Sequence, residues 1–591
     1  MIKSLDTIAE IRRFEEPNNF FEKLSPGEQK EFANELFSRL QYDFTNVSIC
    51  LLDTGLNNGH PLLSGSCEDD CLQSVNAAWQ TSDHDGHGTE MAGVALFHNL
   101  KEKLLSKEKI VIHHRLESVK ILPPPPGAND PQLYGDITKQ AISLAEIARP
   151  NNVRTLCMAI TEDDKYSITD GTPSSWSGSI DTIISGADDD TKRLFFISAG
   201  NVDFSDMKAG YPDANLISPV QSPGQAWNAI TVGAFSNDIT ILDENLKSYH
   251  AVANSGELSP YSSTSKIWAS KWPIKPEILC DGGNVATDGS AYMDCSDLSL
   301  LTTSHQHLKH PFSTICATSS ATAQASWIAA QIMSEYPGIW PETVRALIVH
   351  SADWTSEMKR LFIAGKDKKG YGRRDLLRTC GYGIPNLERA IQCISNRVNL
   401  VIEGEIQPFA KNKKMKEMHL HTLPWASDIL RSIGETPALL KITLSYFVEP
   451  GPGEIGWRDK YRYPSCQLRF DVKNINETKK DFLKRIDVKM REDNDRGSGY
   501  SGSTEWFLGP QNRDVGSIHS DFKKVNAVDL CDANFVAVYS VIGWWRERTN
   551  LKLYDKKVRY SLIVSISTPE TDVDLYTPII TQIQQPVSIP V

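Results

Sequence analysis

The chain of 591 residues has little positive charge and no long apolar run. Lys and Arg together number 62 against 74 Asp and Glu, which gives a net charge of −12. Nucleic acids and anionic membranes are usually bound by a basic face, so this balance argues against both as partners. No run of about 18 apolar residues is present, so no membrane span is predicted. We therefore expect neither nucleic acid nor membrane among the partners of this chain.

The sequence also contains no Cys-x-x-Cys pair and no pattern that predicts a secretory leader. The eleven cysteines include no Cys-x-x-Cys pair, so no zinc site of that kind is predicted. The N-terminal stretch MIKSLDTIAEIRRFEEP lacks the apolar core of a signal peptide. Scattered cysteines in apolar surroundings are typical of reduced, buried side chains. We expect the chain to be cytoplasmic.

Three segments differ in their residue patterns. Residues 1–45 are charged and helical in character, with a Ser-Pro helix start in SPGEQKEFANELFSRL. Residues 46–395 alternate apolar runs such as VSICLLDTG with helical stretches such as GDITKQAISLAEIA. This alternation predicts an α/β fold with a mostly parallel sheet flanked by helices, in which sites gather at the carboxyl ends of the strands. Residues 396–591 carry strand-length runs separated by turn residues, with little helical signal, and predict an antiparallel β-sandwich.

Acidic and histidine side chains follow the first apolar run of the middle segment. Asp53 ends that run, where a carboxylate can orient a histidine, bind a cation or cap the next turn. His84 and His87 lie three residues apart in HDGHGTEMAGVALF. A metallohydrolase site there needs further ligands, and Asp83 and Asp85 are the near candidates. A histidine at a helix start with no catalytic role is the third possibility.

A serine and an asparagine stand at comparable places further along. Ser319 lies at the start of an Ala-rich helix, where positive potential and free N–H groups favour negative charge on a reacting oxygen. Serine is also a common helix N-cap. Asn201 follows the apolar run FFISAG, where its amide can donate to an oxyanion or simply form a turn.

In the order Asp53, His87, Asn201, Ser319, the chain resembles the subtilisin-like serine proteases, or subtilases. The resemblance covers most of residues 46–395. It rests on four short motifs, which are DTG at 53–55, HGT at 87–89, SAGN at 198–201 and TSSA at 318–321.

The resemblance implies a role for each residue. Ser319 attacks the peptide carbonyl, and His87 takes its proton and returns it to the leaving amine. Asp53 holds the tautomer of the imidazole and stabilises its cation. Asn201 and the backbone N–H of Ser319 hold the oxyanion. The implied enzyme is a serine endopeptidase that works through an acyl-enzyme without a cofactor. Structural calcium is common in the family, but no ligand loop in this chain can be matched to it.

Two positions depart from the family pattern. Subtilases pair an extended substrate with the strand that corresponds to LCMA, so Cys157, Met158 and Ala159 are expected to line that edge, although the usual Ser-Leu-Gly is absent. Ala317 stands two residues before the serine, where subtilases usually have glycine. If this position needs a positive φ, its Cβ costs about 1 kcal/mol.

The C-terminal segment is also similar to known sequences. ITLSYFVEPGPGE, YRYPSCQLRFDVK and VYSVIGWWRER resemble the tail of a bacterial group of cytoplasmic subtilases that are often encoded beside an AAA-type ATPase. The resemblance implies a partner-regulated protease in a bacterial defence or stress system. The alternative function is a catalytically silent subtilase-fold interaction module that works through its β-sandwich. The complete set of four residues favours the enzyme.

Overall fold

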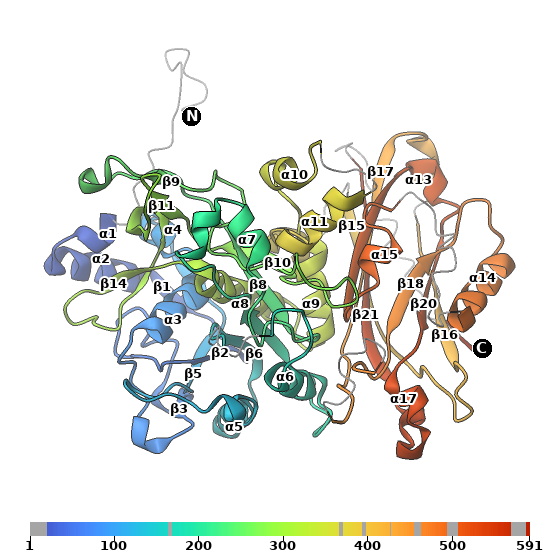
Figure 1. The fold of residues 1–591 in the computed structure, drawn as a ribbon, viewed down its shortest axis with the longest axis horizontal. Coiled ribbons are helices and arrows are strands. Elements are labelled where there is room, and N and C mark those ends of the chain that lie inside the picture. Colours follow the sequence, from blue (N-terminus) through green and yellow to red (C-terminus); the bar gives the residue numbers. More distant parts are fainter. Residues whose placement is uncertain are drawn as a thin grey trace, which may run out of the picture.

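A parallel sheet wrapped by helices and a pair of antiparallel sheets lie side by side in the molecule (Figure 1). The computed structural model describes residues 20–162, 168–365, 370–392, 397–425, 427–453, 462–492, 506–568 and 587–590. None of the described helices combines the length and the apolar character needed to cross a membrane.

The central sheet has seven strands in the order β10-β8-β7-β6-β2-β5-β3, and every neighbouring pair is parallel. Its strands are β2 Val47–Asp53, β3 Leu72–Ser74, β5 Arg115–Lys120, β6 Val153–Met158, β7 Leu194–Ser198, β8 Ile230–Phe235 and β10 Ile278–Asp281. β2 is buried along its whole length, as expected for a strand covered on both faces.

Helices cover both faces of this sheet. The helices of this part of the chain are α3 His87–Phe97, α4 Leu100–Leu105, α5 Tyr134–Ala148, α6 Ser175–Ser185, α7 Asp213–Ile217, α8 Ala317–Glu335, α9 Pro341–Ser351, α10 Ser356–Phe362, α11 Tyr371–Cys380 and α12 Leu387–Ile391. Along β2, Val47, Ile49 and Leu51 belong to the core with α3 and α8, whereas Cys50 and Leu52 belong to the core with α5 and α6. Because successive side chains of a strand point to opposite faces of the sheet, β2 contributes to both cores. The predicted α/β fold class is confirmed.

Shorter elements surround the parallel sheet. The N-terminal helices are α1 Phe20–Lys23 and α2 Pro26–Arg39, and residues 1–19 of the predicted helical segment lie outside the described residues. A capping box between Ser25 and Glu28 starts α2, in agreement with the Ser-Pro signal. The remaining strands are β1 Leu40–Tyr42, β4 Ile110–Ile112, β9 His250–Ala251, β11 Val285–Thr287, β12 Tyr292–Asp294, β13 Leu300–Thr303 and β14 Phe312–Ile315.

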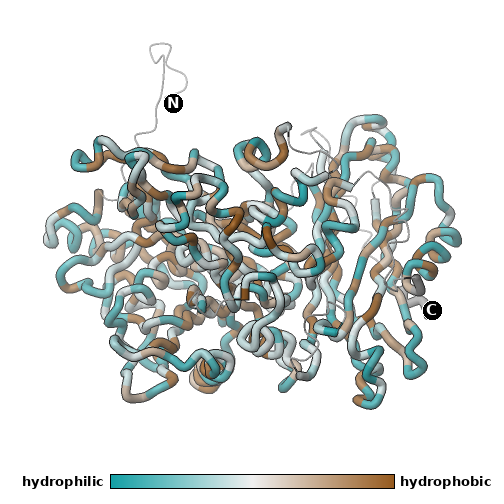
Figure 2. Tube along the Cα trace, in the orientation of Figure 1, coloured by the Kyte–Doolittle hydropathy of each residue, from teal (hydrophilic) through white to brown (hydrophobic). Residues whose placement is uncertain are grey.

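The C-terminal part contains two four-stranded antiparallel sheets around a shared core. Their orders are β15-β21-β17-β19 and β18-β20-β16-β22. The strands are β15 Arg397–Ile406, β16 Glu417–Thr422, β17 Pro437–Tyr446, β18 Leu468–Val472, β19 Ile518–Asn526, β20 Phe535–Ser540, β21 Val558–Ser567 and β22 Val587–Pro590. Apolar (brown) and polar (teal) residues are both present along these sheets (Figure 2), and β20, with the sequence FVAVYS, is mostly apolar. This arrangement confirms the predicted β-rich architecture.

Several helices accompany the C-terminal sheets: α13 Ser427–Ser432, α14 Lys479–Glu492, α15 Pro510–Arg513, α16 Ala527–Leu530 and α17 Trp544–Glu547. The sequence-based expectation of little helix is wrong for α14. Phe482, Ile486 and Met490 recur every four residues, form one apolar face and are buried in the core of the sheets.

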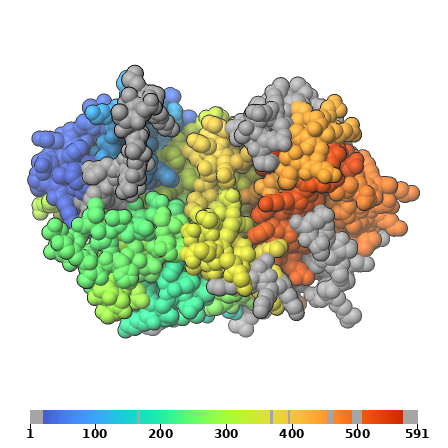
Figure 3. All heavy atoms as spheres, turned by 90° about the horizontal axis from the view of Figure 1, so that it is seen from above, coloured from blue at the N-terminus to red at the C-terminus, as the bar shows by residue number. Residues whose placement is uncertain are grey.

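The two parts meet in a buried polar network. Arg345 of α9 is fully buried, and its guanidinium donates to the Ser517 hydroxyl at 3.0 Å and to the Trp227 carbonyl at 2.8 Å. The Asn228 side chain exchanges two hydrogen bonds with the backbone of Val448. The orange and red C-terminal residues accordingly abut the yellow helical segment in the space-filling view (Figure 3). Because buried charges without partners are costly, this network fixes how the parts sit on each other.

Candidate active site

Asp53 lies at the carboxyl end of β2, near the middle of the parallel sheet. Its side chain is 2% exposed. The carboxylate oxygens lie 2.8 Å and 3.0 Å from Nδ1 of His87, and Oδ1 also accepts the backbone N–H of Thr54. A carboxylate only accepts hydrogen bonds, so the pairing places a proton on Nδ1 and leaves Nε2 of His87 available to take a proton.

His87 is the first residue of α3, and its side chain is 29% exposed. The helix can start this close to the sheet because Gly88 has no side chain. A Cβ at Gly88 would lie 2.0 Å from the carbonyl oxygen of Gly55. The glycine of the HGT motif thus permits the approach that brings His87 to Asp53.

Asp83 anchors the loop before His87. Its buried carboxylate accepts the backbone N–H groups of Asp85, Gly86 and Thr89, and also the hydroxyls of Thr54 and Thr89. Sequence reasoning considered Asp83 only as a metal ligand and missed this role. Its spacing of a few residues before a helix start is typical of a carboxylate that satisfies first-turn N–H groups.

The metal interpretation of this stretch gains no support. His84 is exposed, and the carboxylate oxygens of Asp83 already accept hydrogen bonds from the loop and from the first turn of α3. Within the described residues, no group of three or more His, Cys, Asp and Glu side chains is placed to hold a metal ion.

Opposing effects set the pKa of His87. Burial disfavours the imidazolium and lowers the pKa, but the charge of Asp53 and its hydrogen bond raise it, and Glu90 and Asp85 add to the rise. The result is a pKa of about 9. Glu90, one helical turn beyond His87, was not singled out from the sequence; burial raises its own pKa to about 7.

This pKa predicts an alkaline activity profile. A general base must be neutral to accept a proton, and below pH 9 most of His87 is protonated. We expect kcat/KM for a peptide substrate to rise with pH through a midpoint near the His87 pKa of about 9. Initial rates between pH 5 and pH 10.5, at constant ionic strength, measure this. A midpoint close to the ordinary histidine pKa of about 6.5 would contradict it.

Ser319 is the third residue of α8, which packs against α3 and against the central sheet. The N-cap of α8 is Cys316, so the interpretation of Ser319 as a helix cap is wrong. Ser319 is 9% exposed. Its position in the first turn places it among N–H groups that lack partners within the helix. In the described part of the chain, no hydrogen bond joins its hydroxyl to the ring of His87.

Ala317 adopts the left-handed conformation that was considered from the sequence, with φ +66°. An L-residue with a Cβ is strained there by about 1 kcal/mol or more, whereas glycine is not. We expect Ala317→Gly to raise the free energy of unfolding by about 1 kcal/mol. Urea denaturation measures the change. Ala321→Gly, at a buried position inside the same helix, is the matched control and should destabilise by about 1 kcal/mol or more. Destabilisation by both variants would show that φ at position 317 carries no strain.

Asn201 is held beside the start of α8. Its Oδ1 accepts the backbone N–H of Thr318 at 3.1 Å and the Thr318 hydroxyl at 2.7 Å. With Oδ1 fixed by two donors, the orientation of the amide is set, and no hydrogen bond within the described residues uses Nδ2. The Nδ2–H group is therefore available next to Ser319.

This geometry predicts that replacement of Asn201 lowers kcat rather than substrate binding. We expect Asn201→Ala to lower kcat by about 10²–10³ with little change in KM, because the donor acts on the charge of the transition state. Steady-state kinetics on one peptide substrate measures this. Thr318→Val, which removes one of the two donors to Oδ1 but keeps Asn201, is the control and should cost much less. An equal rise in KM for Asn201→Ala would contradict the assignment.

The predicted substrate strand needs correction. β6 lies between β2 and β7, its ladder with β2 runs to Cys157, and its ladder with β7 runs to Met158. Both side chains are buried. Cys157 and Met158 therefore cannot offer a free edge to a peptide, because neighbouring strands already cover it. Ala159 is the first residue beyond the strand and is partly exposed.

Comparison with known proteins identifies the family. The sequence model described as "Subtilase family" matches residues 45–383, which is more than half of the chain. The chain therefore belongs to the subtilase family, a family of serine proteases, and the family resemblance noted from the four motifs is confirmed.

Individual relatives are distant. The uncharacterized protein y4bN of Sinorhizobium fredii (strain NBRC 101917 / NGR234) is 25% identical over 308 residues, which is 49% of this chain and 65% of that protein. Among solved structures, the S41 psychrophilic protease is 22% identical with a TM-score of 0.35, and covers 53% of this chain and 86% of its own. Sphericase is 20% identical with a TM-score of 0.35, and covers 53% of this chain and 84% of its own.

Proposed function

We propose that this protein is a serine endopeptidase that hydrolyses peptide bonds through Asp53, His87 and Ser319. The observation that carries the proposal is the pair of short contacts from the His87 Nδ1 to the Asp53 carboxylate. This pairing gives the imidazole the tautomer that a general base needs. The position of Ser319 at the start of α8, next to the fixed amide of Asn201, is the second support.

In the proposed mechanism, the substrate carbonyl is attacked by the Ser319 hydroxyl while Nε2 of His87 takes its proton. Hydrogen bonds between nucleophile and base often close only when substrate binds, and we infer this for Ser319 and His87. The oxyanion is held by Nδ2 of Asn201 and the N–H of Ser319. His87 then protonates the leaving amine, and water releases the acyl group by the reverse route.

A fluorophosphonate probe tests the proposal. We expect it to react with Ser319, giving one covalent adduct per chain in intact-protein mass spectrometry and a labelled peptide that contains residue 319. Ser319→Ala should not react. Ser320→Ala is the matched control, since Ser320 is the neighbouring serine and is fully buried. Labelling of Ser320 in place of Ser319 would contradict the assignment of the nucleophile, and no labelling in the presence of any activating partner would favour a silent interaction module.

We further propose that the protease works in the bacterial cytoplasm under the control of an AAA-type ATPase partner, in defence or stress. The ten cysteines that the structure describes are free thiols, which suits a reducing compartment. The C-terminal sequence resemblance is the support for the ATPase. We expect labelling of Ser319 to become faster when a purified AAA-type ATPase from the same organism is added together with ATP, and an unchanged rate would contradict the pairing.

A further inference from the structure

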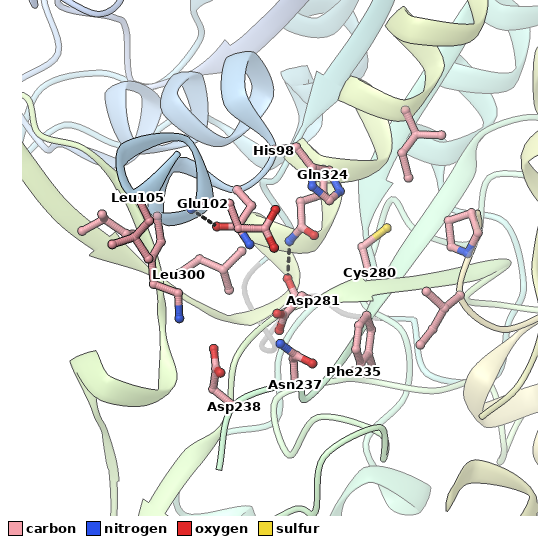
Figure 4. Close-up of a pocket in the computed structure, with 16 residues that line it drawn as sticks. His98, Glu102, Leu105, Phe235, Asn237, Asp238, Cys280, Asp281, Leu300 and Gln324 are labelled. Atoms are coloured by element: carbon pink, nitrogen blue, oxygen red, sulfur yellow. Dashed lines mark hydrogen bonds between the residues drawn. The ribbon is translucent and has the colours of Figure 1, made fainter. Parts of the chain in front are cut away.

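Two cavities of the described chain have opposite charge. The cavity in Figure 4, of about 340 Å³, is lined by the carboxylates of Glu102, Asp238 and Asp281 and by one lysine, Lys101. The other, of about 470 Å³, lies between α10 and α12 of the peptidase part and the sheet β15-β21-β17-β19 of the C-terminal part. A volume of 470 Å³ is typical of a site for a small molecule. We call this second cavity the junction cavity.

Cations line the junction cavity on both of its walls. On the helical wall, Lys359 comes from α10 and Arg389 from α12. The sheet contributes Arg397, Lys441 and Lys524. The protein has a net charge of −12, so its overall composition does not explain why five lysine and arginine side chains line one cavity.

The strand register explains why the cations of the sheet share one face. Arg397 pairs with Ser567, Ser567 with Leu439, and Leu439 with Lys524, which forms one row across the four strands. Lys441 stands two residues beyond Leu439 on the same strand and therefore on the same face. The sheet thus presents three cations toward the same space.

Two carboxylates are among the lining residues, and Asp353 lies close to two of the lining cations. Asp353 contacts Lys359 at 3.4 Å and Arg389 at 3.8 Å. Asp521 is buried and accepts the backbone N–H groups of Leu508, Gly509 and Phe522. The lining therefore holds five lysine and arginine side chains against two carboxylates, one of which, Asp353, is shared between Lys359 and Arg389.

Hydrogen bonds hold His350 and Lys441 in the wall of the junction cavity. Both ring nitrogens of His350 are used, by the Thr443 hydroxyl at 2.9 Å and the Ser565 hydroxyl at 2.7 Å. The Lys441 ammonium donates to the carbonyl of Ala352 at 2.7 Å. Burial lowers the pKa of Lys441, Asp353 opposes the shift, and Arg397 and Arg389 lower the pKa further, to about 7. The cations thus repel one another across the cavity.

We propose that the junction cavity binds a small phosphate-bearing molecule. A phosphate group carries about −1.5 to −2 charges at neutral pH and several acceptor oxygens, so one such group matches the excess of lysine and arginine donors. Arginine binds it in planar, two-point fashion and lysine as a point charge. Trp354 and Phe522 add aromatic surface for an organic portion of the ligand. This inference does not depend on the proposed protease activity.

The binding experiment uses the full chain and three probes, which are inorganic phosphate, pyrophosphate and ADP. We expect saturable binding by isothermal titration calorimetry and a rise in the thermal midpoint with probe concentration. Chloride at matched ionic strength serves as the reference. Tighter binding of ADP than of pyrophosphate would show that the organic portion is recognised, and equal binding would show that phosphate alone is. Absence of saturable binding for all three up to about 10 mM would overturn the proposal.

A matched pair of variants locates the site. Arg389→Gln combined with Lys524→Gln removes two exposed cations of the junction cavity, and folding should be unaffected. We expect this variant to bind pyrophosphate about tenfold more weakly. Lys30→Gln combined with Lys557→Gln makes the same change of charge at exposed positions that do not line the cavity, and should bind like the wild type. Equal weakening in both variants would show a non-specific effect of net charge and would overturn the site.

Discussion

Ser319→Ala should lower kcat for a peptide substrate by about 10⁶ while leaving the fold intact, because the hydroxyl is the proposed nucleophile and no neighbouring group can replace it. His87→Ala should cost about as much. The combination of both changes should cost little more than either, since nucleophile and base act as one unit. Steady-state kinetics on all three variants measures this, with circular dichroism to check folding.

Two results would contradict this prediction, one from the double variant and one from a variant of the neighbouring serine. If the two single losses simply multiplied in the double variant, Ser319 and His87 would act independently and the proton relay would be excluded. Ser320→Ala serves as the control for local packing, since its hydroxyl donates to the carbonyls of Asp281 and Ala317. A loss comparable to that of Ser319→Ala would mean that helix packing rather than chemistry limits the rate.

Asp53→Asn should lower kcat by about 10⁴. The amide that replaces the carboxylate can turn its NH₂ toward Nδ1 of His87, which selects the tautomer that cannot accept the serine proton. The same change removes the attraction that raises the pKa of His87, whereas burial still lowers it. The residual activity should therefore have its midpoint at a lower pH than the wild type. A pH profile of kcat/KM measures both effects.

Asp85→Asn is the matched control for this variant. Asp85 is exposed and also raises the pKa of His87, but it makes no hydrogen bond to the ring in the described structure. Its loss should move the midpoint slightly downward and leave the maximal rate nearly unchanged. If Asp85→Asn reduced the maximal rate as strongly as Asp53→Asn, general electrostatics rather than orientation of the imidazole would be responsible.

The sequence predicted those features that have a strong local signal. The apolar run that ends at Asp53 became β2, and the HGT motif became the start of α3, so the two side chains meet as expected. In the C-terminal part, the runs that begin near residues 397, 437 and 558 became β15, β17 and β21. A continuous or alternating apolar run is sufficient to specify a strand of this length.

The features that were missed depend on where elements end and on contacts between distant residues. The run LCMAI is apolar across the end of β6, so the sequence does not mark where the strand stops, and Cys157 and Met158 were assigned to a substrate-binding edge although neighbouring strands cover them. The acceptor role of Asp83 requires the loop conformation to be known. The cations of the junction cavity come from chain segments far apart, and their register exists only after folding.

The fully buried guanidinium of Arg345 restricts which C-terminal domain this peptidase part can carry. Its partners include Trp227 beside the parallel sheet and Ser517 beside the antiparallel sheets. A domain that covered Arg345 with apolar side chains alone would leave the buried cation short of acceptors, which costs several kcal/mol. Any C-terminal domain grafted onto this surface must therefore offer a polar acceptor at the position of Ser517.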